Sequence, residues 1–304
     1  MNAFVPPKTT GLAVGLGASA LLLALSAAAL AGVAALPPSP AAFLLLCLAL
    51  LSLPATVWVV YRTAGLAGAH YHLTRDALTV AWGSRREVIP LDEIEEAHPA
   101  AEFAGELRPP ALRWPGCIVG LVTQPELGVV EFLATTTEKQ GLVLIGYPGG
   151  WLALSPPAPD AFLAALAERR AEGVAAPVRA VSVYPALPQW PLWRDRLALG
   201  LIAAGGLALL ALIGYFTFIF PQLPPQMALR FNAQGEPIRF GPPRGLFTLA
   251  YIGAVAWTLN TLAGIGLHRR EQDRAMAYLL FGATLLVMAL VWTAAIGLLT
   301  AGRA

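Results

Sequence analysis

Few side chains in this sequence could carry out chemistry, and the most suggestive are two closely spaced histidines. His70 and His72 would present both imidazoles on one face of a strand, an arrangement that zinc can use. No third ligand is obvious nearby, so we predict no metal site. Ser84, Ser155 and Ser182 lack the histidine and aspartate partners that nucleophilic catalysis needs. These residue types predict a protein that is not an enzyme and needs no cofactor.

A second group of candidate residues lies in residues 221–245, which are rich in proline, glycine and polar side chains. Asn232 to Gly235 reads as one turn, and Pro237 with Gly241 fixes a second. Such a loop could sense a ligand or a peptide, or could only cap the helices beside it. The candidate ligand or partner residues are Arg230, Phe231, Asn232, Gly235, Glu236, Pro237, Phe240 and Gly241.

The composition shows which kind of scaffold must position these residues. Of 304 residues, 57% are hydrophobic and 12% are charged, against roughly 45–50% and about 25% in soluble globular proteins. This balance excludes an ordinary cytosolic enzyme and a nucleic-acid binder, and it predicts an integral membrane protein. The charge is uneven, because residues 64–196 hold 11 basic and 15 acidic residues, and the rest of the chain holds 9 and 3.

Five stretches are apolar over the roughly 20 residues that a membrane-spanning helix needs. None contains aspartate, glutamate, lysine, arginine or histidine, so the groups of a proton-coupled transporter, a pump or an intramembrane metalloprotease are missing. Asn260 and Thr261 are expected to make helix–helix hydrogen bonds. The first stretch could be a cleaved signal peptide, but it is longer than a signal's apolar region, so we expect it to be retained. The stretches are 11–36, 41–61, 197–220, 246–267 and 276–300, and residues 37–40 join the first two as a hairpin.

Lysine and arginine residues near the helix ends predict the orientation. With the N-terminus inside, eight basic residues flank the cytoplasmic ends and four flank the opposite ends. We therefore expect a protein of the cell membrane whose N-terminus and soluble segment are cytoplasmic and whose C-terminus is extracytoplasmic. Cys47 and Cys117 fall in an apolar stretch and in the soluble segment, so no disulfide is expected.

Residues 64–179 have the pattern of a small β-rich domain. Short runs of β-branched and aromatic residues alternate with turn residues, as in a β-meander. The expected strands are 70–74, 77–82, 86–89, 117–123, 128–135, 141–147 and 151–155. Residues 159–171 then predict an amphipathic helix, with an apolar stripe of Phe162, Leu163, Leu166 and Ala167. This order predicts a β-barrel or sandwich closed by a C-terminal helix.

Three motifs in this segment carry a resemblance to bacterial pleckstrin-homology-like (PH) domains. They are Tyr71-x-Leu73-x-x-Asp76-x-Leu78-x-Val80-x-Trp82-Gly83, Val88-Ile89-Pro90-Leu91-x-x-Ile94 and Ser155-Pro156-x-x-Pro159-Asp160-x-Phe162-x-x-x-Leu166. The resemblance implies a PH fold. Phosphoinositide binding, which eukaryotic members often show, is not expected, since only Arg85 and Arg86 occupy an early loop and carboxylates repel anionic headgroups. Those carboxylates are Asp92, Glu93, Glu95, Glu96, Glu102 and Glu106.

Residues 221–245, with the third and fourth apolar stretches, resemble a membrane domain of unknown function. That domain also occurs in immunity proteins that protect bacteria against a secreted sporulation-delay killing peptide, where it accompanies signalling to a repressor. The match departs at Arg230, Ile238 and Arg244, where the family pattern has histidine, an acidic residue and lysine. It runs through Phe231, Asn232, Gly235, Glu236, Pro237, Phe240 and Gly241.

The predicted organisation is a multi-pass α-helical membrane protein with an inserted PH-like domain. Its parts are a two-helix hairpin (1–63), the domain (64–179), a Pro-rich linker (180–196) and a three-helix bundle (197–304). We predict a non-enzymatic protein of the lipid bilayer whose domain is a protein-interaction or scaffold module, binding a protein partner or itself. An envelope-sensing or immunity-like role is expected of the loop. The alternative is a transporter or channel subunit for an uncharged or hydrophobic solute.

Overall fold

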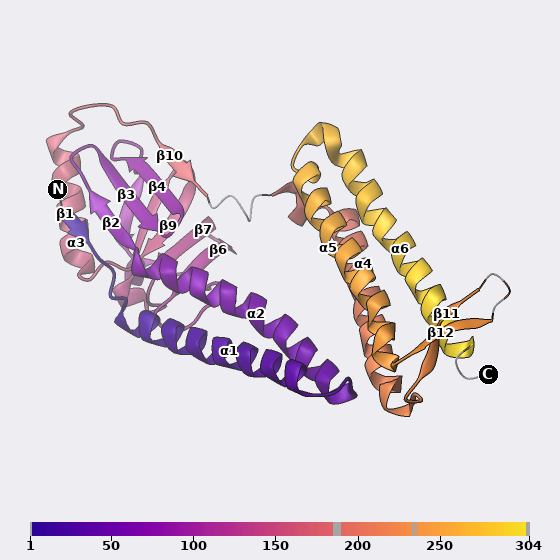
Figure 1. The fold of residues 1–304 in the computed structure, drawn as a ribbon. Helices are drawn as coiled ribbons and strands as arrows, with labels where there is room; N and C mark the ends of the chain where they lie inside the picture. The colour runs from indigo at the N-terminus through magenta and orange to yellow at the C-terminus, as the bar shows by residue number, and fades with distance from the viewer. Residues whose placement is uncertain (1, 185–189, 233, 235, 302–304) are drawn as a thin grey trace. The chain divides into compact units, whose positions relative to one another are not determined.

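Five long apolar helices dominate the computed structural model, which describes residues 2–184, 190–232, 234 and 236–301 (Figure 1). All five are long and apolar enough to cross a membrane. They are α1 (Thr9–Ala35), α2 (Pro40–Ala67), α4 (Arg196–Ile219), α5 (Phe247–His268) and α6 (Arg274–Ala301). The predicted multi-pass architecture is confirmed. Helix α2 continues past its apolar stretch to Ala67, so the helix itself leads into the β-rich domain.

Contacts divide the chain into two units, which are described separately. The first comprises Met1–Leu25 and Ser52–Pro185, and the second comprises Ser26–Leu51 and Ala186–Ala304. Short 3-10 helices connect the larger elements in both units. They are η1 (Ala100–Glu102), η2 (Lys139–Gly141), η4 (Pro191–Arg194), η5 (Phe220–Gln222), η6 (Pro243–Leu246) and η7 (Glu271–Asp273).

Besides parts of α1 and α2, the first unit contains two five-stranded sheets and helix α3 (Pro159–Glu172), and we call these two sheets and α3 the sandwich domain. The first sheet has the order β1 (Asn2–Phe4), β2 (His70–Leu73), β3 (Ala77–Trp82), β4 (Arg85–Pro90), β10 (Val181–Val183). The second has the order β5 (Glu96–Pro99), β8 (Val143–Tyr147), β9 (Gly150–Leu154), β7 (Gly128–Ala134), β6 (Ile118–Gln124). All described pairings are antiparallel except β7 with β9, and each lies within one sheet. The sheets therefore form a sandwich and not the closed barrel that was the other predicted form.

The core of the sandwich domain lies between the inner faces of the two sheets. Tyr71 and Leu78 of the first sheet and Ile145 of the second are fully buried there. Helix α3 (Pro159–Glu172) closes this core with Phe162 and Leu166. The predicted stripe on this helix is too broad, because Leu163 is half-buried and Ala167 is exposed. The tyrosine hydroxyl donates to the carbonyl of Leu133 at 2.6 Å, and burial raises the pKa of Tyr71 to about 12.

Three strands of the sandwich domain were not predicted from the sequence. Strand β1 comes from the N-terminus, ahead of α1, and pairs with β2. Strand β10 lies in the segment predicted to be a linker and pairs with β4. Strand β5 pairs with β8 and ends at Pro99. Each has only three or four residues, so partner strands elsewhere in the chain create these strands and local periodicity does not.

The second unit contains α4, α5 and α6, with a hairpin of β11 (Met227–Phe231) and β12 (Pro237–Gly241) after α4. Buried apolar side chains join the three helices, among them Leu212, Phe216 and Val291. Asn260 donates to the hydroxyl of Thr284 on α6 at 3.2 Å, so the expected helix–helix hydrogen bond of this residue is confirmed.

Two glycines bring the backbone of α1 against a loop of the sandwich domain. A Cβ atom on Gly11 would lie 2.1 Å from the carbonyl oxygen of Gly116, and Gly116 itself has a φ of +82°. Gly17, six residues further along α1, has nothing within 4 Å of the same position. Of these two positions on α1, Gly11 is therefore the one at which close backbone packing requires glycine.

We predict that Gly11→Ala lowers the stability of the full chain by about 1–3 kcal/mol, because an added methyl group overpacks this contact. Gly17→Ala on the same helix is the matched control and should leave the unfolding midpoint unchanged or slightly raised. Thermal unfolding in detergent measures both. Equal midpoints for the two variants would contradict the close backbone contact.

Candidate functional site

Arg62 joins α2 to the sandwich domain. It is the first charged residue after the apolar stretch of this helix. Its guanidinium donates to the carbonyl oxygens of Leu112 (Nη1, 2.8 Å) and Val119 (Nη2, 2.9 Å). The same group lies 5.0 Å from the ring centre of Trp58 and 5.4 Å from that of Trp114. One planar side chain thus holds the helix, the loop before β6 and β6 itself.

The start of α1 is tied to the same place. Lys8, just before α1, donates to the carbonyl oxygens of Ala67 at the end of α2 (2.5 Å) and of Ala69 just before β2 (3.5 Å). Terminal helix carbonyls lack intrahelical partners, so a cation is stabilising there. Trp114 donates from Nε1 to the carbonyl of Gly11 at 3.1 Å. Both helices of the hairpin are therefore bonded to the sandwich domain, and we call these contacts the hairpin clamp.

A buried ionic cluster connects the two sheets. The Nη2 atom of Arg85 lies 2.6 Å from Oε2 of Glu87 and 2.7 Å from Oε2 of Glu131, and Nε donates to the other oxygen of Glu131 at 2.8 Å. All three residues are buried. Burial by itself would lower the pKa of Arg85, but the hydrogen bonds and charges of the two carboxylates raise it above its ordinary value. With two carboxylates to one guanidinium, the cluster holds one negative charge in excess.

The same arginine holds β10. Its Nη1 atom donates to the hydroxyl of Ser182 (3.1 Å) and the carbonyl of Val183 (3.2 Å). The ring of Tyr184 stacks on the guanidinium, 3.7 Å from its central carbon to the ring centre. Burial and then the charge of Glu131 raise the pKa of the Tyr184 hydroxyl. The sequence placed Arg85 in a loop that could have bound lipid headgroups, but in the structure its side chain is buried in the protein interior.

The carboxylates that follow β4 lie along residues 92–106, before, within and after strand β5, which is one edge strand of the second sheet. Five are exposed and Glu93 is half-buried. The exposed ones are Asp92, Glu95, Glu96, Glu102 and Glu106, and we call these five residues the acidic edge. Among the described residues of this edge, Arg108 forms an exposed ion pair with Glu106 at 3.3 Å, which adds little stability.

The predicted loop residues lie in the β11–β12 hairpin, which was expected to be turns without strands. Arg230 faces Arg239 across the hairpin, and Phe231 pairs with Pro237. Arg230, Glu236, Pro237 and Phe240 are exposed, Phe231 and Gly241 are half-buried, and Gly235 lies outside the described residues. The register therefore places two like charges opposite each other, which is unfavourable in a hairpin.

Asn232 shapes this hairpin from within. Its side-chain oxygen accepts from the backbone N–H groups of Gln234 (3.0 Å) and Glu236 (2.8 Å), and its Nδ2 donates to the Glu236 carboxylate at 2.8 Å. These bonds form an Asx-type turn. Its polar atoms are thus occupied, so Asn232 contributes the shape of the candidate loop and not a free ligand group.

A polar cluster that was not predicted joins the ends of α4, α5 and α6. Asp195 caps α4 by accepting from the N–H of Ala198 at 3.0 Å. Its other oxygen accepts from Nε2 of the buried His268 at 2.8 Å and from the hydroxyl of Tyr278. These hydrogen bonds, that of Ala198 first, hold the pKa of Asp195 well below its usual range. Asp195 and His268 lie just outside the apolar stretches 197–220 and 246–267, and the uncharged Tyr278 lies near the start of 276–300, so charged residues within the stretches do not reveal this cluster.

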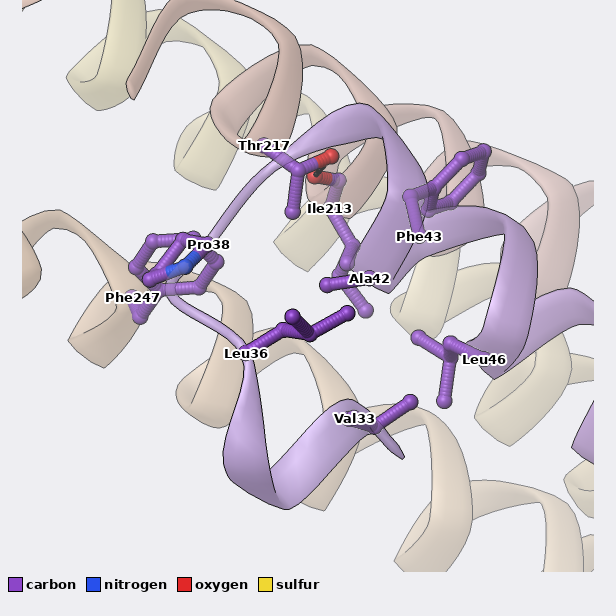
Figure 2. A pocket seen from close by; sticks show the side chains of 9 residues that line it. All are labelled: Val33, Leu36, Pro38, Ala42, Phe43, Leu46, Ile213, Thr217 and Phe247. Carbon is purple, nitrogen blue, oxygen red and sulfur yellow. Dashed lines mark hydrogen bonds between the residues drawn. The ribbon is translucent and has the colours of Figure 1, made fainter. Parts of the chain in front are cut away.

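An apolar pocket of about 220 Å³ lies within the second unit (Figure 2). Its one hydroxyl, on Thr217, already donates to the carbonyls of Ile213 and Gly214. The pocket therefore suits an apolar group and offers no polar anchor. It is lined by Val33, Leu36, Pro38, Ala42, Phe43, Leu46, Ile213, Thr217 and Phe247.

The histidines and serines considered for chemistry are engaged locally. His70 and His72 share one face of β2, as predicted, with ring centres 6.2 Å apart. In the part of the chain that the structure describes, no three potential ligands gather as a metal site. Ser84 bonds to the hydroxyl of Tyr61 at 2.7 Å, and Ser155 accepts from the backbone of Thr135 at 2.8 Å.

Comparison with known proteins covers the sandwich domain. A family model described as "Bacterial PH domain" matches residues 69–170, which run from the start of β2 nearly to the end of α3. This segment is a PH-like domain. No curated protein and no solved structure matches the chain. The matched segment ends before the C-terminal bundle, so the immunity-protein resemblance of that region stays a prediction.

We predict that Arg85→Met destabilises the PH-like domain by about 3–5 kcal/mol, because two buried carboxylates lose their partner. Arg86→Met, the exposed neighbour, is the matched control and should leave the unfolding midpoint of the full chain unchanged. Replacing all three members with apolar residues should restore most of the loss. If Arg85→Met unfolds at the same temperature as the control, the cluster does not stabilise the domain.

The Asp195 cluster predicts loss of stability in acid. Because folding lowers the pKa of this carboxylate, its contribution is fully present above the unfolded value of about 4 and declines as the pH falls towards the folded value. Asp195→Asn should lower the unfolding midpoint at pH 7 and flatten its dependence on pH below about 4. Glu271→Gln, whose side chain is 88% exposed, is the control and should keep the acid dependence of the parent.

Proposed function

We propose that this chain is a non-enzymatic membrane protein whose PH-like domain is an interaction platform fixed at the membrane surface. The observation that carries the proposal is the hairpin clamp. Arg62 of α2 bonds to a loop of the domain, and Lys8 bonds the start of α1 to the end of α2, where the chain enters the domain. Such contacts hold the domain at the end of the spanning segments, as a scaffold requires. The domain would bind a protein partner or a second copy of itself.

The acidic edge supports a basic protein surface as the partner. Five exposed carboxylates fall within residues 92–106, and complementary charge speeds association and selects partners. Arg85, which could have contributed to a basic lipid-binding cup, is occupied by Glu87 and Glu131. The proposal therefore excludes phosphoinositide as the main ligand.

Affinity purification of the full chain from mild detergent tests this role. A triple variant of the acidic edge, Asp92→Asn with Glu95→Gln and Glu96→Gln, should lose its co-purifying protein. The matched control neutralises three other exposed carboxylates, Glu126, Glu138 and Glu168, and should retain it. A parent chain that purifies alone would contradict the scaffold role.

The proposed orientation places the PH-like domain in the cytoplasm. Cys117 is a poor reporter of this, because it is buried and burial raises the pKa of its thiol. Ala164→Cys, on the exposed face of α3, should stay unlabelled by a membrane-impermeant thiol reagent in intact cells and react after lysis. Labelling in intact cells would reverse the orientation.

For the bundle we propose an envelope-sensing role, with the β11–β12 hairpin as the receiving element. Its exposed Arg230, Arg239 and Phe240 support contact with a peptide or another envelope component. An immunity-like regulatory role follows only from the family resemblance of this region.

The alternative function is a transporter or channel subunit for an uncharged or hydrophobic solute. The apolar pocket of the second unit favours it, because its lining lacks charged groups. A solute flux that needs the three-helix bundle but survives loss of residues 64–179 would support transport in place of scaffolding.

A further inference from the structure

Arg62 and Lys8 mark the level at which the membrane hairpin leaves the bilayer core. Residues 41–61 of α2 carry no charge, and at 1.5 Å per residue they span about 30 Å, the thickness of the hydrocarbon layer. Lys8 immediately precedes α1. The first charges at this end of both helices therefore lie at the headgroup layer.

The loop before β6 is held at that same level. Leu112 accepts from Arg62 through its backbone carbonyl. Trp114 packs edge-on against Trp58 with ring centres 6.0 Å apart, and its indole donates to Gly11 of α1. Trp58 lies one helical turn nearer the bilayer centre than Arg62. The loop thus reaches the depth where tryptophan is enriched in membrane proteins.

The side chains of this loop suit that depth. Leu112 is 68% exposed, and Arg113 beside it is also exposed. Arg113 donates to the carbonyl of Pro110 at 2.8 Å, so the loop closes on itself and presents the leucine outward. A lone exposed leucine is unremarkable on a soluble surface, but here the backbone of the leucine is bonded to Arg62, at the end of the apolar stretch of α2.

We propose that residues 110–114 form a membrane-contact loop, in which Leu112 enters the boundary between headgroups and acyl chains. The partner is the bilayer itself, with no particular headgroup required. Together with the hairpin clamp, this contact gives the PH-like domain one orientation on the membrane. This proposal does not depend on a protein partner. The membrane contact can therefore be disproved while the scaffold role stands, and the scaffold role can be disproved while the membrane contact stands.

The test uses the full chain in phosphatidylcholine nanodiscs. A nitroxide label is placed at Leu112→Cys in a Cys47→Ala background, with the buried Cys117 retained. The accessibility of the label to oxygen, which concentrates in lipid, is compared with its accessibility to a water-soluble nickel chelate. Ala164→Cys, exposed on α3, is the matched control.

The expected result is an oxygen-to-nickel ratio several-fold higher at residue 112 than at residue 164. Equal ratios would overturn the proposal, because they would place Leu112 in water. Should Leu112→Cys fail to fold, Ala111→Cys reports on the same loop, since its own side chain is exposed. Its label should likewise exceed the control ratio, and a water-like value there would also overturn the proposal.

Discussion

The structure of the first unit depends on the bonds that Arg62 makes where α2 leaves the membrane. A guanidinium at the edge of the hydrocarbon layer needs acceptors, and the carbonyls of Leu112 and Val119 supply them. These acceptors belong to the sandwich domain, so satisfying one membrane-proximal charge also docks a domain on a helix. The close contact of Gly11 with Gly116 and the bonds of Lys8 then extend the docking to α1. The platform role proposed for the PH-like domain rests on this arrangement.

The Arg85 and Asp195 clusters likewise join separate elements by giving one charged group several partners. Arg85 is satisfied by groups from β4, β7 and β10, and Asp195 by groups at the ends of α4, α5 and α6. A buried or half-buried charge is costly unless several partners reach it. Each cluster therefore selects one arrangement of three elements over the alternatives that apolar packing alone would allow.

The two units expose different polar and apolar surfaces, and these surfaces support the different functions proposed for each unit. The PH-like domain keeps its arginine inside and exposes the acidic edge, which favours a basic protein over an anionic headgroup. The second unit has an apolar pocket without a free polar anchor and a hairpin with exposed arginines. The proposed functions therefore assign recognition by charge to the domain and the hairpin, and an apolar frame to the long helices.

The sequence by itself determined the five spans, most long strands and the PH-like domain, because uninterrupted apolar stretches and alternating patterns are local signals. Only the tertiary structure decided that the sheets form an open sandwich, since alternation says which face is apolar and not whether a sheet closes. Strands β1, β5 and β10 are too short for a pattern and exist through their partners. The sequence placed Arg85 in a surface loop, but in the structure it is buried and bonded to Glu131, 46 positions away. Asp195 likewise meets His268 and Tyr278 across 73 and 83 positions, and contacts over such separations follow from the packing of helices and sheets.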